Sequence, residues 1–405
     1  MTETLSEKWQ GALVAMICGS MILFLSLGIR HAFGLFLQPV TMSQGWGRET
    51  FAFAIALQNL IWGISQPLTG MLADRFGAKP VVAFGAIFYG FGLWVMSIES
   101  DETLFIFGAG ILIGLGLSGT TFPVIFGAIS RLVASEHRSL AMGITMSVAS
   151  FGQFAMLPIA LVLINGFDWQ AALILLSILA FAMLPLAFGV RFAPAPPSSA
   201  LENVSSSQAL RDAFGTRDFW LLSLGFFTCG FQVVFIAVHL PAFLADENIG
   251  NGVATSVLAL IGLVNIAGTY CAGLWGGRHR KPMLLTWIYI GRAVVIATFI
   301  LLPVTNASAY IFGILMGVFW LSTVPLTNGT VASIWGVKHM SMLGGIVFLA
   351  HQLGSFMGGW MGGWLYDHTG SYDTAWGAAI ILSLVAALLN WPITERSLEH
   401  RRAAA

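Results

Sequence analysis

Charged side chains are scarce in this sequence. Asp, Glu, Lys and Arg make up only 9% of the 405 residues, whereas an ordinary globular chain carries about a quarter. Apolar residues make up 57%. Because so few charges cannot cover a surface exposed to water, the composition excludes a soluble domain and predicts that most of the surface faces lipid.

Cysteine and net charge are also nearly absent. The three cysteines, Cys18, Cys229 and Cys271, lie inside apolar runs, which indicates small core residues and predicts neither a disulfide framework nor a zinc site. The formal net charge is zero, so nothing in the composition favours a nucleic-acid partner. The sequence contains no nucleophile–base constellation, phosphate loop or ATP-binding motif. We therefore expect no enzyme activity, no cofactor and no metal.

Long apolar runs are what the sequence has in abundance. Such runs are too long for barrel strands, and backbone polar groups in lipid must be satisfied within the segment, so each run is predicted to be a helix. The first run is too long for a signal peptide and is expected to be retained as a span. The predicted spans cover residues 11–38, 50–72, 80–98, 104–130, 138–164, 169–190, 218–245, 252–276, 282–303, 307–333, 341–366 and 374–392.

One long polar segment divides these spans into two sets of six. Its Pro, Ser and Ala residues cannot build a core, so it is predicted to be a flexible linker. The expected domains are an N-terminal six-helix bundle (1–191), a cytoplasmic linker (192–217) and a C-terminal six-helix bundle (218–405). The predicted fold class is an all-α membrane protein, with twelve transmembrane helices in two pseudo-symmetric bundles.

The basic residues indicate the orientation. If the N-terminus lies in the cytoplasm, fifteen of the 18 Lys and Arg residues fall in cytoplasmic segments and only Arg48 lies outside. Arg30 and Arg292 lie within spans. This bias agrees with the positive-inside rule and predicts that both termini are cytoplasmic.

Residues 70–79, GMLADRFGAK, connect the second and third spans. They resemble the signature of the major facilitator superfamily, and a degenerate second copy stands at 273–281, GLWGGRHRK. The resemblance implies a gate at the cytoplasmic face. Gly70 would allow close helix approach and Gly77 a tight turn. Asp74 would accept hydrogen bonds from a helix N-terminus or from an Arg across the seam between the halves. Arg75 and Lys79 would hold the cytoplasmic face closed. The alternative is a plain positively charged loop.

Arg30 is the main candidate for binding substrate. An ionisable group within a span is costly and usually faces a cavity, and no Asp or Glu is predicted mid-span to neutralise it. An unneutralised cation favours an anionic substrate. The alternative is that Arg30 reaches the membrane interface or bonds to backbone carbonyls. Arg292 is predicted to be structural, bonded to neighbouring helices.

Further polar residues are candidates for the same cavity. His31 and His351 are candidate proton relays, since histidine titrates near neutral pH, although a lone histidine is more often a satisfied core residue. For each of the others the alternative is a helix–helix hydrogen bond. The predicted substrate-binding set is Arg30, His31, Gln58, Asn59, Gln153, Gln232, Asn265, Trp320, Thr327, His351 and Gln352.

Two shorter motifs narrow the resemblance. Residues 138–144, RSLAMGI, and 367–372, DHTGSY, resemble the bacterial monocarboxylate and oxalate/formate branch. That branch often has a positive residue in span 8, where this chain has Asn265, and in span 11 oxalate exchangers have another where this chain has His351. The resemblance implies a bacterial inner membrane location and a small-organic-anion symporter or antiporter.

We therefore predict a secondary active transporter of a monocarboxylate-like anion that works by alternating access. Its expected partners are the anion, protons and membrane lipid, without nucleic acid, and we expect a monomer. The alternatives are a drug or metabolite exporter with an aromatic apolar pocket, and a sensor-like membrane protein without net transport.

Overall fold

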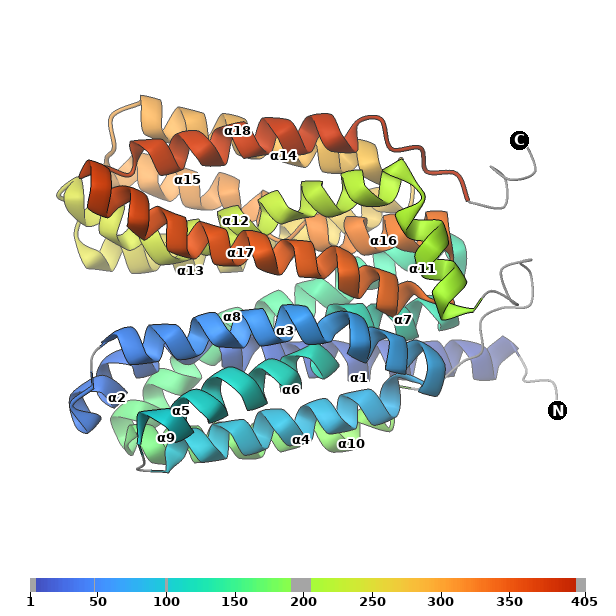
Figure 1. Ribbon diagram of the computed structural model, residues 1–405, viewed down its shortest axis with the longest axis horizontal. Coiled ribbons are helices and arrows are strands. Elements are labelled where there is room, and N and C mark those ends of the chain that lie inside the picture. The colour runs from blue at the N-terminus through green and yellow to red at the C-terminus, as the bar shows by residue number, and fades with distance from the viewer. Residues whose placement is uncertain (1–4, 47, 99–100, 191–204, 398–405) are drawn as a thin grey trace.

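The computed structural model describes residues 5–46, 48–98, 101–190 and 205–397, and all regular secondary structure in these ranges is helical. The long helices run roughly side by side along one axis (Figure 1). The first turn of the helix that begins at Leu5 and the described chain after the last helix, residues 391–397, lie at the same end of the molecule, which we call the terminal face. The other end is the opposite face. This arrangement requires an even number of crossings.

The first bundle contains six spans, of which the first, fourth and sixth are composite. They are α1 (Leu5–His31) continued by η1 (Ala32–Phe36) and α2 (Leu37–Gln44); α3 (Arg48–Phe76); α4 (Ala78–Ser97); α5 (Glu102–Ile106) with the π-helix η2 (Phe107–Leu112), α6 (Ile113–Thr120) and α7 (Phe122–Leu132); α8 (Arg138–Gly166), preceded by η3 (Ser135–His137); and α9 (Trp169–Phe181) with α10 (Met183–Ala187).

The second bundle repeats this plan. Its spans are α12 (Arg217–Asp246), α13 (Asn251–Gly276), α14 (Lys281–Leu301), α15 (Asn306–Phe319) with α16 (Thr323–Trp335), α17 (Met340–Thr369) and α18 (Asp373–Asn390). The fourth span of each bundle is interrupted at its middle, before Pro123 in the first bundle and before Pro325 in the second. Proline cannot donate to the preceding turn, so both breaks have the same local cause.

The predicted fold class is confirmed: twelve membrane-spanning helices form two six-helix bundles. Among the described residues, eleven helical segments are long and apolar enough to cross a membrane. The remaining span, α3, is long enough but less apolar than the other eleven, because it carries Gln58, Asn59 and Gln66 in its middle.

The predicted linker is partly helical. Residues 192–204 lie outside the described residues, but Ser206–Phe214 form helix α11, and Ser205 caps it by accepting from the backbone N–H of Gln208. The expectation of a wholly flexible segment was therefore wrong for residues 206–214. Leu210 of α11 packs against the core, and Ala209 and Ala213 are buried, so this apolar stripe explains why a Ser-rich segment folds.

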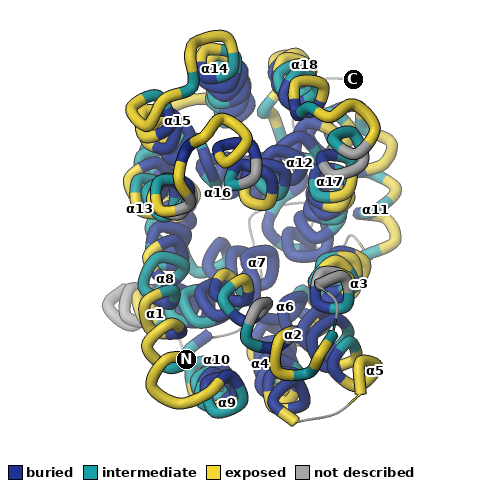
Figure 2. The backbone as a smooth tube through the Cα atoms, turned by 90° about the vertical axis from the view of Figure 1, so that its left-hand side faces the viewer, coloured by how far each residue is buried: buried dark blue, intermediate teal, exposed yellow. Residues whose placement is uncertain are grey.

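Two pairs of helices form the seam between the bundles: α3 faces α17, and α8 faces α13 (Figure 2). Small residues allow both approaches. Gly143 of α8 lies directly against Gly273 of α13. Farther along the same pair, the Ser147 and Thr269 hydroxyls lie 3.0 Å apart, and Asn265 donates to the Ser150 hydroxyl at 2.8 Å. These contacts lie in the half of the seam nearer the terminal face.

Candidate functional site

A polar cluster spans the α3–α17 seam near the middle of the molecule. Arg30, in the last turn of α1, donates from Nη2 to the Asn59 side-chain oxygen of α3 at 2.5 Å. Gln352 of α17 donates from Nε2 to the Asn59 backbone oxygen at 3.2 Å, with the Asn59 side-chain oxygen 3.4 Å away. The two bundles therefore meet at Asn59, and three of the predicted site residues lie together there.

His351 extends this cluster into the second bundle. Its Nδ1 lies 3.2 Å from the Gln352 side-chain oxygen and 3.5 Å from the Ser355 hydroxyl. An amide oxygen only accepts, so Nδ1 carries the proton in this contact. The bond orients the Gln352 amide so that its nitrogen faces Asn59.

Aromatic rings surround the cluster. The guanidinium carbon of Arg30 lies 5.1 Å from the centre of the Trp62 ring, a cation–π contact. The ring centre of Phe348 lies 4.8 Å from that of Trp62 and 5.2 Å from that of His351, on which it stacks. The ring centre of Phe122 lies 4.9 Å from that of Phe348 and completes the group. Low polarity around Arg30 strengthens every electrostatic interaction that its guanidinium makes.

Arg30 has binding capacity left over. Its Nε is buried and has no hydrogen-bond partner. The side chain lies at intermediate burial, and its neighbour His31 is exposed. In the described residues, Asp and Glu occur only near helix ends, in α11 or in loops. The partners of Arg30 within the protein are thus neutral, and the cation lacks a carboxylate.

The structure places the remaining predicted residues elsewhere. Gln58 is buried and donates to the Ala109 carbonyl, which ties α3 to η2. Asn265 joins α8 to α13 and also accepts from the Leu321 backbone N–H at 2.9 Å. Gln153 is half-buried on α8, and Thr327 is buried in α16. These side chains do not join the Arg30 cluster through any hydrogen bond recorded for the described residues.

Gln232 and Trp320 belong to a second centre, built around Arg292. Arg292 is fully buried. It donates from Nη2 to the Phe319 carbonyl at 2.7 Å and to the Trp320 carbonyl, and from Nη1 to the Gln232 side-chain oxygen at 3.1 Å. These carbonyls stand where α15 breaks before α16 and lose their intrahelical donors. Arg292 therefore caps a broken helix, and its predicted bonding to neighbouring helices is confirmed.

We expect the substitution Arg292→Met to destabilise the protein by about 1–3 kcal/mol for each buried carbonyl that it leaves without a donor. The melting temperature of the purified protein, measured by differential scanning fluorimetry, should fall on the order of 10 °C. Arg278→Gln removes an exposed arginine after α13 and is the control that should not change it. Equal melting of the Arg292→Met and unsubstituted proteins would contradict the capping role.

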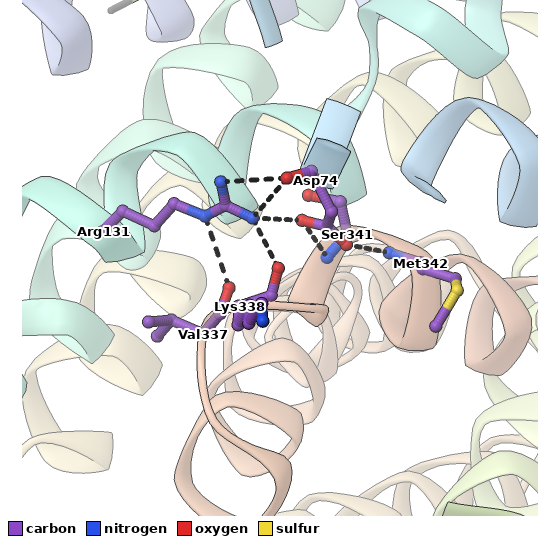
Figure 3. A network of polar contacts seen from close by, with 6 residues as sticks. All are labelled: Asp74, Arg131, Val337, Lys338, Ser341 and Met342. Atoms are coloured by element: carbon purple, nitrogen blue, oxygen red, sulfur yellow. Dashed lines mark hydrogen bonds and ion pairs between the residues drawn. The ribbon is translucent and has the colours of Figure 1, made fainter. Parts of the chain in front are cut away.

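The 70–79 motif forms a contact between the bundles at the terminal face (Figure 3). The Asp74 carboxylate accepts from the backbone N–H groups of Ser341 at 3.3 Å and Met342 at 2.8 Å, in the first turn of α17. It also pairs with Arg131 at 2.7 Å, and both side chains are almost fully buried. A carboxylate is stabilised at a helix N-terminus by the unpaired N–H groups and the helix dipole.

Arg131 was missed by the sequence reasoning. It lies in the last turn of α7, in the same bundle as Asp74, rather than across the seam. Its guanidinium crosses the seam itself, donating to the backbone oxygens of Val337 at 3.4 Å and Lys338 at 2.5 Å. In the sequence, a basic residue at the end of a span indicates orientation alone, so only the neighbouring helices reveal its partners.

The two motif glycines have the predicted geometry. A Cβ on Gly70 would collide with the Ser341 backbone, so glycine is what allows α3 to approach α17. Gly77 has φ of 88°, a left-handed conformation that disfavours other residues, at the turn into α4. Arg75 and Lys79 are exposed instead and lie over the rings of Phe76 and Phe188, within their own bundle. The pair that bridges the seam is Asp74 and Arg131.

Comparisons with known proteins agree with this architecture. Residues 12–359 match the family model described as Major Facilitator Superfamily. An uncharacterized MFS-type transporter of Bacillus subtilis, YcxA, is 25% identical over 381 residues, 89% of this chain and 90% of that protein. Human monocarboxylate transporter 11 is 25% identical over 380 residues, 89% of this chain and 78% of that protein.

Solved structures give the same fold. The fucose:proton symporter FucP of E. coli superposes with a TM-score of 0.73 at 15% identity, covering 94% of this chain and 98% of that one. The proton:xylose symporter XylE superposes with a TM-score of 0.71 at 15% identity, covering 98% and 99%.

Proposed function

The chain belongs to the major facilitator superfamily, a family of membrane transporters, and is not an enzyme, and we propose that it carries a small organic anion of the monocarboxylate class. The proposed mechanism is alternating access, with proton symport or anion exchange as the coupling. The observation that carries the proposal is the Arg30 cluster: a half-buried cation at the seam that lacks a carboxylate and has a buried, unpartnered Nε.

The electrostatics of the site support an anion rather than a neutral or cationic substrate. Charged groups form hydrogen bonds about twice as strong as neutral ones, and Arg presents a planar fork that matches a carboxylate. The Asn59 amide oxygen satisfies only part of the Arg30 guanidinium. A substrate carboxylate would supply the missing charge, and the similarity to monocarboxylate transporters favours the same class.

The seam contacts support a carrier that is closed at one face. Asp74 and Arg131 hold the first turn of α17, and Gly143 packs on Gly273, all toward the terminal face. We propose that this face is cytoplasmic, because the basic loops gather there, and that the protein acts as a monomer in a bacterial inner membrane. Substrate would then enter from outside in this conformation and leave after the seam contacts break.

One observation favours a second candidate, an exporter of apolar aromatic compounds. The rings of Trp62, Phe122 and Phe348 pack together beside Arg30, and such surfaces bind flat apolar molecules. In that case Arg30 would be a structural residue.

Uptake by purified protein in liposomes separates the two candidates. We expect lactate, pyruvate, oxalate, formate or benzoate to be taken up, and unlabelled acids to compete, whereas lipophilic cations should not. Competition by lipophilic cations alone would support the exporter and refute the anion proposal. Binding of an acid without any flux would instead indicate a sensor-like protein.

A further inference from the structure

The Asn59 side chain occupies an unusual position between the two bundles. Its oxygen accepts from Arg30 of the first bundle at 2.5 Å and lies 3.4 Å from the Gln352 amide nitrogen of the second. Its own nitrogen donates to the Ile55 carbonyl at 2.9 Å. That last bond fixes the orientation of the amide, so the oxygen is held toward Arg30 and Gln352.

This oxygen is a weak acceptor in a place that suits a strong one. Two donors converge on it, one of them charged, while the acceptor itself is neutral. A carboxylate oxygen in the same position would form a charge-assisted bond with Arg30 and still accept from Gln352. The buried Nε of Arg30, which has no partner, offers a second donor beside Nη2 for a bidentate contact.

We propose that Asn59 is a placeholder acceptor, which holds Arg30 and Gln352 in the empty carrier and is displaced by the carboxylate of the substrate. This inference rests on the proposed function and assigns Asn59 the control of affinity at that site. Because Gln352 stands on α17 and Arg30 on α1, a shared carboxylate pulls the two bundles toward each other. Binding of the anion is thereby linked to closure of the opposite face.

The residue type follows from this role. An Asp at position 59 would be a permanent internal anion, which would neutralise Arg30 and compete with the substrate. An apolar residue would leave the Arg30 cation without its acceptor in a region of low polarity, which is costly. Asparagine has the shape of aspartate but no charge. It therefore gives Arg30 a hydrogen-bond acceptor that is sufficient for folding, and an anion can displace it.

The experiment compares Asn59→Asp with Asn59→Ala in the full chain, without any ligand. Spin labels at Met42 and Thr374, exposed residues of α2 and α18 near the opposite face, report the distance between the bundles. Cys18 and Cys271 are replaced by Ala for labelling, and the buried Cys229 is kept. We expect Asn59→Asp to shorten the label distance toward that of the form closed at the opposite face. We expect Asn59→Ala to leave the distance at that of the form open at this face. An unchanged distance in Asn59→Asp would overturn the proposal.

Asn265→Asp is the matched control, because it puts the same charge on the other seam, where Asn265 accepts from a backbone N–H. It should not shorten the distance, and an equal shortening in both variants would show a general effect of charge and overturn the proposal. Unfolding curves establish that each variant is folded, and Asn59→Ser replaces Asn59→Ala if the latter does not fold.

Binding of lactate, pyruvate, oxalate, formate and benzoate, which we call the panel acids, gives the second readout. We expect Asn59→Asp to weaken binding at least about 100-fold, whereas Asn59→Ala should bind equally well or up to about tenfold more tightly. A loss in Asn59→Ala as large as in Asn59→Asp would make Asn59 a direct substrate contact and refute the placeholder role. If the unsubstituted chain binds no panel acid, the proposed function fails and the displacement by a substrate carboxylate fails with it, while the label distance without ligand still decides whether an anion beside Arg30 and Gln352 draws the bundles together.

Discussion

Arg30→Gln is expected to lower the affinity for carboxylates at least about 100-fold while the protein still inserts and folds. Removing one partner of a buried charged pair costs about 2–5 kcal/mol, and Arg30 supplies the cation of the proposed site. Glutamine can still donate to Asn59, whose oxygen now accepts from Arg30 at 2.5 Å. The bond between the helices is thus kept and the charge is lost. Isothermal titration with the panel acids measures the change.

Two further variants make this test specific. Arg30→Lys keeps the charge but loses the planar fork, so we expect an intermediate loss of about tenfold. Arg278→Gln removes an exposed arginine far from the cluster in sequence and should leave the affinity unchanged. If Arg30→Gln binds the acids as tightly as the unsubstituted protein, Arg30 is structural and the anionic substrate loses its main support.

Asp74→Asn is expected to slow transport at least tenfold while carboxylate binding persists. The substitution keeps the shape but removes the charge that pairs with Arg131 and caps α17. Arg131 lies in the same bundle as Asp74, so the pair itself does not separate the two forms. The bonds from the Ser341 and Met342 N–H groups to the Asp74 carboxylate cross the seam, and hydrogen bonds to a charged group contribute about 1.5–3 kcal/mol each. Their loss weakens the closed terminal face, so the equilibrium shifts toward the form that is open at that face.

Accessibility of a cysteine placed at Ser139 measures this shift directly. Ser139 is buried on α8, against Gly276 of the second bundle, so a membrane-impermeant maleimide should reach it only when the terminal face opens. We expect labelling at least tenfold faster with Asp74→Asn. The control, Asp212→Asn in α11, removes an acidic residue that bonds to Gln208 within its own helix. Equal labelling of the Asp74→Asn and Asp212→Asn proteins would mean that the Asp74 contact does not hold the seam.

Much of the site could be predicted from local sequence, because the cost of a polar group in lipid is high wherever it stands. Arg30 and Asn59 stood out as polar residues within apolar spans, and they do meet. Gln58 stood out for the same reason, yet it donates to the Ala109 carbonyl in its own bundle. The rotation of a helix about its axis decides between these outcomes, and only packing against neighbours sets it.

The sequence by itself determined the helical membrane fold, the division into two bundles and the turn and close helix approach of the 70–79 motif. Those features depend on composition and on local rules: apolar length, backbone satisfaction in lipid, and a glycine at a left-handed turn. Only the tertiary structure decided that Asp74 pairs with Arg131, that Arg292 caps a broken helix, and that Asn59 joins Arg30 to Gln352. These contacts join residues 27 to 293 positions apart, and their partners are fixed by how twelve similar helices pack, which no local pattern encodes.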